Sequence, residues 1–225
     1  MTLLFPVGAL RPQSIDFNLT PQNTRGATSL TGGSQVIASS AGLWTATVRG
    51  IRVYGRDNLL LWRTLEARLE GTLNPILIPV CQGNRQPYPA VQPIAYGGIP
   101  HGDGTSFSDG SGYYQRAIDA SLLFSVPRGA VQAWINVTVG GDLEPGQYFS
   151  LGERLYRIKS IEKVSGAASF VKFWPTAREA APAGTRVEFD KPHCKMRLRS
   201  DDGMALATEM NKRANPTIEL QEDLS

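Results

Sequence analysis

The chain has 225 residues, 41% hydrophobic and 19% charged, which is enough to fill one large all-β core or two smaller ones. Its formal net charge of +3 comes from 23 basic and 20 acidic residues without any basic run, which argues against specific nucleic-acid binding. No apolar run approaches the roughly 20 residues that a transmembrane helix needs. The 23 Gly and 15 Pro predict many turns.

The first residues lack a basic segment, and Pro6 interrupts their apolar run, so we do not expect a secretory signal. Cys81 and Cys194 allow one disulfide, but we favour two buried free thiols in a protein that folds in a reducing cytoplasm.

Alternating apolar residues predict a half-buried strand over residues 14–20. A tight hairpin is expected at Gly32-Gly33, between residues 29–31 and 35–38. A long strand follows over residues 43–54. Its apolar residues move from one face of the strand to the other at Gly50, which predicts a bulge or a change of sheet.

The one strong helical pattern covers residues 58–70, with Asp57 as the expected N-cap and Gly71 as the expected end. Its predicted buried stripe consists of Leu61, Trp62, Leu65 and Leu69. Because so short a helix cannot stand alone, we expect it to brace a sheet. The apolar run at 76–80 is typical of a short buried strand.

Residues 82–112 contain seven Gly and four Pro, which predicts a long excursion from the core sheet with an irregular strand at 91–96. Strand patterns return at 117–126, 131–139, 148–151, 155–164, 169–174 and 186–189. Glu144-Pro-Gly-Gln predicts a type II turn, and residues 176–181 one helical turn. Residues 142–190 are thus expected to form a small barrel-like set of short strands.

Residues 194–200 alternate between apolar and basic side chains, as in a half-buried strand. Asp201-Asp-Gly203 predicts a hairpin turn into a return strand at 204–208, and a last strand is expected at 217–220.

No pattern indicates a catalytic, metal or cofactor site, so we predict a protein that is not an enzyme. The loop containing His101, Asp103 and Asp109 offers oxygen ligands for Ca²⁺, but it lacks EF-hand spacing and is more simply a loop. No Ser has a nucleophile-elbow pattern, and no carboxylate pair is marked as that of a glycosidase. The glycosylation sequons at Asn18 and Asn136 lie in predicted strands, where chance explains them.

Three aromatic residues are candidates for contact with a protein or a glycan: Tyr113, Tyr114 and Trp174. The competing interpretation is that they belong to the core, as most aromatic residues in strands do.

The segments LTGGSQVI, GLWTATVRG and LLLWRTLEARLEGTLNPILIP resemble the N-terminal domain of distal tail proteins of long-tailed bacteriophages. PGQYFSLGERLYRIKSI is similar to a hairpin of that family's second region. KMRLRSDDGMALATEM and PTIEL look like its returning C-terminal strands. The likeness covers residues 28–80, 145–161 and 195–220.

The resemblance implies a mainly β fold with two domains. One is a sandwich-like sheet domain formed by residues 1–130 and 191–225 and braced by the helix. The other is a peripheral barrel-like domain at 131–190, inserted before the returning strands. In that family the sheet domain forms the channel wall of a ring, commonly of six copies, between the tail tube and the hub at the tail tip.

The expected function is therefore a structural protein of the virion tail, assembled in the host cytoplasm, with its own copies, the tube protein and the hub or tip proteins as partners. The alternative is a carbohydrate-binding β-sandwich module for host attachment, with Tyr and Trp side chains stacking on sugar. A third class, a hydrolase acting on cell wall, rests only on scattered Asp and Glu residues.

Overall fold

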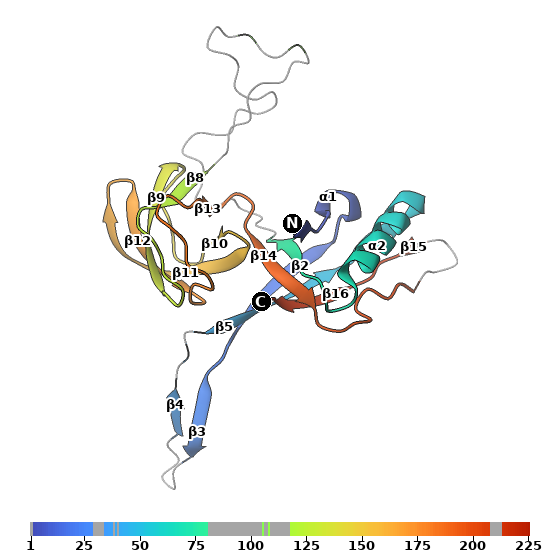
Figure 1. Ribbon diagram of the computed structural model, residues 1–225, viewed down its shortest axis with the longest axis horizontal. Helices are drawn as coiled ribbons and strands as arrows, with labels where there is room; N and C mark the ends of the chain where they lie inside the picture. Colours follow the sequence, from blue (N-terminus) through green and yellow to red (C-terminus); the bar gives the residue numbers. More distant parts are fainter. Residues whose placement is uncertain are drawn as a thin grey trace.

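The computed structural model describes residues 2–28, 34–37, 39, 41–80, 105, 108, 118–207 and 213–225. The predicted mainly β fold is confirmed: two six-stranded sheets dominate the described residues, with two short two-stranded sheets beside them (Figure 1). The described residues also include two helices, and neither is long and apolar enough to cross a membrane.

The first sheet combines strands from both ends of the chain. Its order is β1 (Leu3–Leu4), β7 (Ile76–Pro79), β14 (His193–Leu198), β16 (Ile218–Glu222), β5 (Gly42–Arg49) and β2 (Ser14–Pro21). β1 and β7 are parallel, and all other neighbours are antiparallel. The central strands alternate between buried apolar and outward polar residues, so the sheet has one core face and one polar face.

Helix α2 (Gly55–Leu69) contributes to the core on this face, as the sequence predicted. Trp62, Leu65 and Leu69 are buried, and Leu61 is half-buried. The Trp62 indole N–H donates to the carbonyl of Met204 at 3.0 Å, so even the polar atom of this buried ring has a partner.

The ends of α2 differ from the prediction. The helix begins at Gly55, so Asp57 lies in its first turn and the expected Asp57 cap is wrong. Asp57 can still favour the positive end of the helix dipole from there. At the other end Glu70 adopts the left-handed conformation, with φ 49°, and Gly71 continues it with φ 65°. The four-residue helix α1 (Val7–Leu10), which buries Leu10, was not predicted.

The expected change of sheet at Gly50 is confirmed. β5 ends at Arg49, Gly50 turns the chain with φ 62°, and β6 (Val53–Tyr54) pairs with β15 (Arg213–Ala214) in a separate two-stranded sheet. The positive φ favours glycine here, and a side chain at Gly50 would also displace the Gln13 side chain, which lies 2.6 Å from the position of an added Cβ.

The second sheet forms the predicted barrel-like unit. Its order is β13 (Val187–Glu188), β10 (Tyr148–Leu151), β11 (Arg154–Ser165), β12 (Ala168–Trp174), β9 (Gln132–Val139) and β8 (Asp119–Leu122). A bridge between Ser121 and Arg186 joins its two end strands, so the barrel is nearly closed. Its core includes an aromatic cluster in which Phe149 contacts Tyr156, Phe173 and Phe189. Tyr156 and Phe173 also contact each other. β8 belongs to this barrel, although we assigned its residues to the sheet domain.

Two predicted elements are wrong. Residues 204–207 form no strand after the Asp201 turn, because β14 pairs with the distant β7 and β16 instead. Residues 176–181 form no helical turn. They run irregularly along the barrel and pair through an isolated bridge between Val126 and Ala181.

A hairpin of β3 (Thr24–Thr28) and β4 (Ser34–Ile37) continues from β2 and returns into β5. It forms its own two-stranded sheet and projects away from both six-stranded sheets (Figure 1). A hairpin lies in this part of the chain and β4 matches the predicted second strand, but β3 precedes the predicted first strand at 29–31, which lies outside the described residues. Its expected glycine turn, the strand at 91–96 and nearly all of the excursion at 82–112 lie outside the described residues.

Candidate functional site

The two six-stranded sheets meet at a junction formed by the start of β11 and the ends of β5 and β16. Leu155 of the barrel is fully buried in the core of the first sheet. The Trp44 indole N–H donates to the Leu155 carbonyl at 2.8 Å. Nearby, the Lys195 backbone N–H donates to the carbonyl of Glu153 at 2.8 Å. The barrel is therefore attached through both packing and directed hydrogen bonds.

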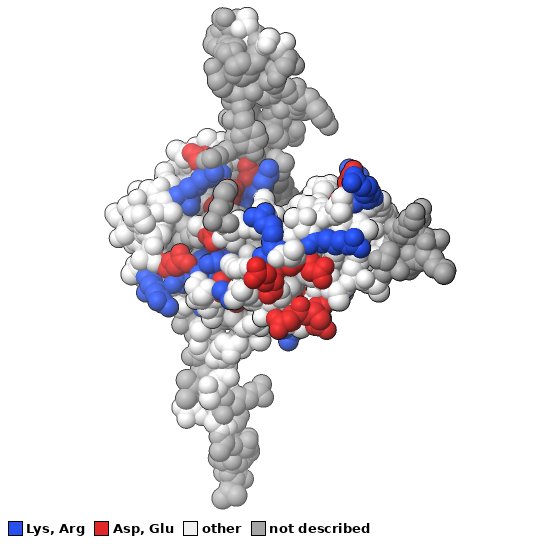
Figure 2. Space-filling view, turned by 45° about the vertical axis from the view of Figure 1, so that its right-hand side comes forward, with Lys and Arg blue, Asp and Glu red and all other residues white. Residues whose placement is uncertain are grey.

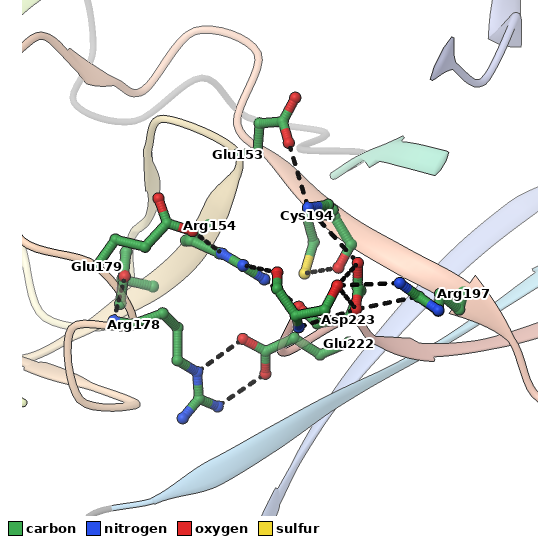
Figure 3. Close-up of polar contacts among 11 residues, drawn as sticks. Glu153, Arg154, Arg178, Glu179, Cys194, Arg197, Glu222 and Asp223 are labelled. Atoms are coloured by element: carbon green, nitrogen blue, oxygen red, sulfur yellow. Dashed lines mark hydrogen bonds and ion pairs between the residues drawn. The ribbon is translucent and has the colours of Figure 1, made fainter. Parts of the chain in front are cut away.

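A buried ion pair crosses the same junction (Figure 3). Arg178, from the segment after β12, donates through Nε and Nη2 to the two carboxylate oxygens of Glu222, each at 2.8 Å. The Glu222 side chain is completely buried, and its Oε2 also accepts the backbone N–H of Trp44 at 3.2 Å. Arg178 further donates to the Gly42 carbonyl. This two-point geometry fixes orientation as well as charge.

A second arginine holds the segment that follows β16 (Figure 3). Arg154 donates to the carbonyls of Asp223 and Ser225, and pairs with Glu179 at 2.8 Å. The Asp223 carboxylate lies 3.0 Å from Nε of Arg197. Burial acts to raise the pKa of Asp223, but hydrogen bonds from Ser225 and the charge of Arg197 outweigh it and hold that pKa below its ordinary value.

Two neutral groups complete the junction. The Tyr156 hydroxyl accepts the Arg178 backbone N–H at 3.0 Å, and burial raises its pKa from 10.0 to about 12. Cys194 is a buried free thiol whose pKa is raised by burial and by the neighbouring Glu222, which makes it unreactive. Its possible partner in the sequence, Cys81, lies outside the described residues.

A cavity of about 840 Å³ opens beside this network, between the base of the projecting hairpin and the outer face of the barrel. Its polar lining includes Arg157 and Lys159 of β11, Lys172 of β12, and Asn23 and Ser39 near the hairpin. The indole of Trp174 forms part of its wall. A cavity of this size between two packed units is a common location for a ligand site.

Trp174, one of the three predicted contact residues, is half-buried at this place. A methyl group added at Gly42 would lie 2.9 Å from its Cζ2 atom, so one part of the indole packs closely on β5. The residue therefore belongs both to the junction and to the cavity wall. Tyr113 and Tyr114 lie outside the described residues.

The basic residues of the cavity were not singled out in the sequence. The alternation of inward and outward residues along β11 and β12 could have identified them. Ile158, Val171 and Phe173 point inward, and their neighbours Arg157, Lys172 and Trp174 point outward. Nothing local in the sequence links the Arg178–Glu222 pair, whose members are 44 residues apart.

No protein-family model matches the chain, and no curated protein is significantly similar to it in sequence. Within the described ranges, no group of three or more His, Cys, Asp and Glu side chains is placed to hold a metal ion. The junction offers two capabilities: it fixes the barrel on the first sheet, and it presents a basic cavity with an aromatic wall.

Proposed function

We propose that the chain is a structural subunit of a ring at the distal end of a phage tail, where copies of it join the tail tube to the tip or hub. Six copies are expected from the family resemblance. The proposal rests chiefly on one observation: the first sheet has a long open edge, β2, that continues directly into a projecting hairpin.

The open edge suits pairing with another chain. β2 has eight residues and, within the described part of the chain, pairs only with β5. Edge strands of monomeric proteins are usually shortened or carry charges that prevent such pairing. The only charged side chain of β2 is Asp16, and Pro21 stands at its far end. A neighbouring subunit could therefore extend the sheet.

The projecting hairpin of β3 and β4 also supports contact with a neighbouring subunit. A two-stranded hairpin on its own is marginally stable in water, so β3 and β4 need further contacts. Val36 on β4 is 49% exposed, although its side chain is apolar. Contacts with a neighbouring copy would bury this side chain and stabilise the hairpin.

The polar face of the first sheet suits a channel wall. Asn18, Thr45, Gln221 and Arg197 form a row across four neighbouring strands, on the side opposite the core. Acidic and basic side chains lie next to one another on the face shown in Figure 2. With α2 and the barrel on the core side, the polar side can face a water-filled lumen.

These features also fit the symmetry of a ring. A closed ring of identical subunits uses two different surfaces, which meet head to tail. The first sheet offers such a pair in its two unlike edges, long β2 and two-residue β1. The rigid junction would then hold every barrel at the same angle on the outside.

The oligomeric state of the purified full chain tests this proposal. We expect native mass spectrometry to give a closed oligomer, most simply a hexamer, and negative-stain images to show an open centre. A strict monomer, even in the presence of the tail-tube and hub proteins, would contradict the proposal.

A matched pair of variants tests the role of the edge. Thr20→Lys places a charge on edge strand β2, where it should disfavour strand pairing and shift the oligomer to monomer. Gln221→Lys places the same charge on the same face, but on the inner strand β16, and should leave the oligomer intact. Equal loss of the oligomer in both variants would speak against edge pairing.

A further inference from the structure

We infer that the cavity beside Trp174 binds an acidic saccharide, meaning a sugar ring that carries a carboxylate or a phosphate. This inference concerns a ligand site on each subunit and does not depend on the ring. The hypothesis of sugar binding, first based on predicted aromatic residues alone, then applies to a defined cavity at the junction of the two sheets.

The charge of the cavity selects an anion. Three cationic side chains line it, Arg157, Lys159 and Lys172, and no Asp or Glu is among its lining residues. Only Lys172 has a carboxylate partner among the described residues: Glu162, at 3.2 Å. Both side chains of that pair are well exposed, at 44% and 39%, so the pair is weak and a ligand can replace it.

The other residues that line the cavity favour a ligand with a sugar ring over a small inorganic anion. Trp174 supplies an apolar aromatic surface against which the C–H groups of a sugar can pack. Asn23 and Ser39 add an amide and a hydroxyl for hydrogen bonds to sugar hydroxyls. Asn23 Oδ1 accepts the Ser39 backbone N–H at 3.0 Å, which fixes the orientation of the amide.

The side chains that line the cavity discriminate between classes of ligand. A neutral sugar would leave Arg157 and Lys159 without a counter-charge. Inorganic phosphate would leave the indole and the amide unused. The volume of about 840 Å³ lies within the range of small-molecule sites and is too large for a single small ion. An acidic sugar unit of a larger glycan uses the cations, the ring and the polar groups together.

Calorimetric titration of the full chain with four probes tests the inference: glucuronic acid, glucose 1-phosphate, glucose and inorganic phosphate. We expect at least one acidic sugar to bind about tenfold more tightly than glucose and than phosphate, a difference of ~1.4 kcal/mol. If neither acidic sugar binds, or if phosphate alone binds as tightly, the inference is wrong.

A double variant locates the site. Arg157→Gln with Lys159→Gln removes two cations from the cavity and should weaken acidic-sugar binding about tenfold or more. Lys163→Gln, on the same strand but outside the cavity lining, is the control and should bind as the wild type does. Unchanged affinity in a correctly folded double variant would overturn the assignment.

The result is separable from the ring proposal, because the substituted residues Arg157 and Lys159 lie on β11 of the barrel and not on β2. A double variant that forms the normal oligomer but no longer binds acidic sugar supports the site alone. A monomeric wild type that still binds acidic sugar would contradict the ring and leave the site standing.

Discussion

The indole N–H of Trp44 donates to the carbonyl of Leu155 at 2.8 Å, which links the start of β5 in the first sheet to the start of β11 in the barrel. Both residues are fully buried. The same Trp44 gives its backbone N–H to Glu222, the acceptor of Arg178. One tryptophan thus takes part in two of the links between the sheets, through its indole and through its backbone.

Trp44→Phe tests that link. The variant keeps an aromatic ring but leaves the buried Leu155 carbonyl without its donor and opens space beside it. We expect a loss of about 1–3 kcal/mol in the free energy of unfolding, measured by urea denaturation. Trp134→Phe is the control, since Trp134 is half-buried on the outer face of the barrel, and it should cost clearly less.

Arg178→Met should be more damaging than any surface charge change. It leaves the buried carboxylate of Glu222 without its cation, a loss of about 3–5 kcal/mol. Adding Glu222→Gln removes the unpaired charge and should restore part of that stability. Arg199→Gln breaks a pair exposed at 56% and 62%, so less than ~1 kcal/mol is expected. Equal losses for Arg178→Met and Arg199→Gln would refute the importance of the buried pair.

Gly42→Ala should disturb the contact between β5 and Trp174. The added methyl group would lie 2.8 Å from Leu19 Cδ1 and 2.9 Å from Trp174 Cζ2, closer than carbon atoms normally approach. Overpacking of this kind costs about 1–3 kcal/mol, which thermal unfolding would report as a lower Tm. Gly8→Ala, in helix α1 with no atom within 4 Å, should leave Tm unchanged or slightly higher.

Alkaline pH should weaken the fold through Tyr156. Its pKa rises from 10.0 to about 12 on folding, so its contribution is complete below pH 10.0 and is lost as pH rises through about 12. The total for two pKa units is about 3 kcal/mol. Urea midpoints from pH 8 to 12, compared with those of Tyr156→Phe, measure this effect. The variant should start lower, because the hydrogen bond to Arg178 is gone, and fall less steeply with pH.

The predictions made from the sequence were correct where a local pattern of residues is enough to determine the structure. The change of apolar face at Gly50 marks a change of sheet, and the strands predicted at 148–151 and 155–164 are confirmed as the paired strands β10 and β11. Gly146 has φ 94° at the third position of the turn predicted from Glu144, as a type II turn requires. In each case a glycine conformation or an alternating run is sufficient, without knowledge of distant residues.

The predictions were wrong where segments distant in the sequence pair with a strand in place of its local neighbour. The turn at Asp201 suggested a local return strand, but β14 is occupied on both sides, by β7 and β16. Glu222 and Asp223, which follow the strand predicted at 217–220, are both buried against arginines. Only the folded chain brings Arg178 to the Glu222 carboxylate and Arg154 to the backbone carbonyls of Asp223 and Ser225, so no spacing in the sequence reveals the junction.

The position of β16 in the first sheet sets the order in which the protein can be completed. β16 lies between β14 and β5, although it is the last of the sheet's strands to be synthesised. Before residues 218–222 emerge from the ribosome, the sheet can exist only as two separate parts, β2 with β5 and β1 with β7 and β14. Glu222 also arrives with this strand, so the barrel receives its buried counter-charge at the same moment. A chain that ends before residue 218 therefore lacks both the continuous six-stranded sheet and the buried carboxylate that pairs with Arg178.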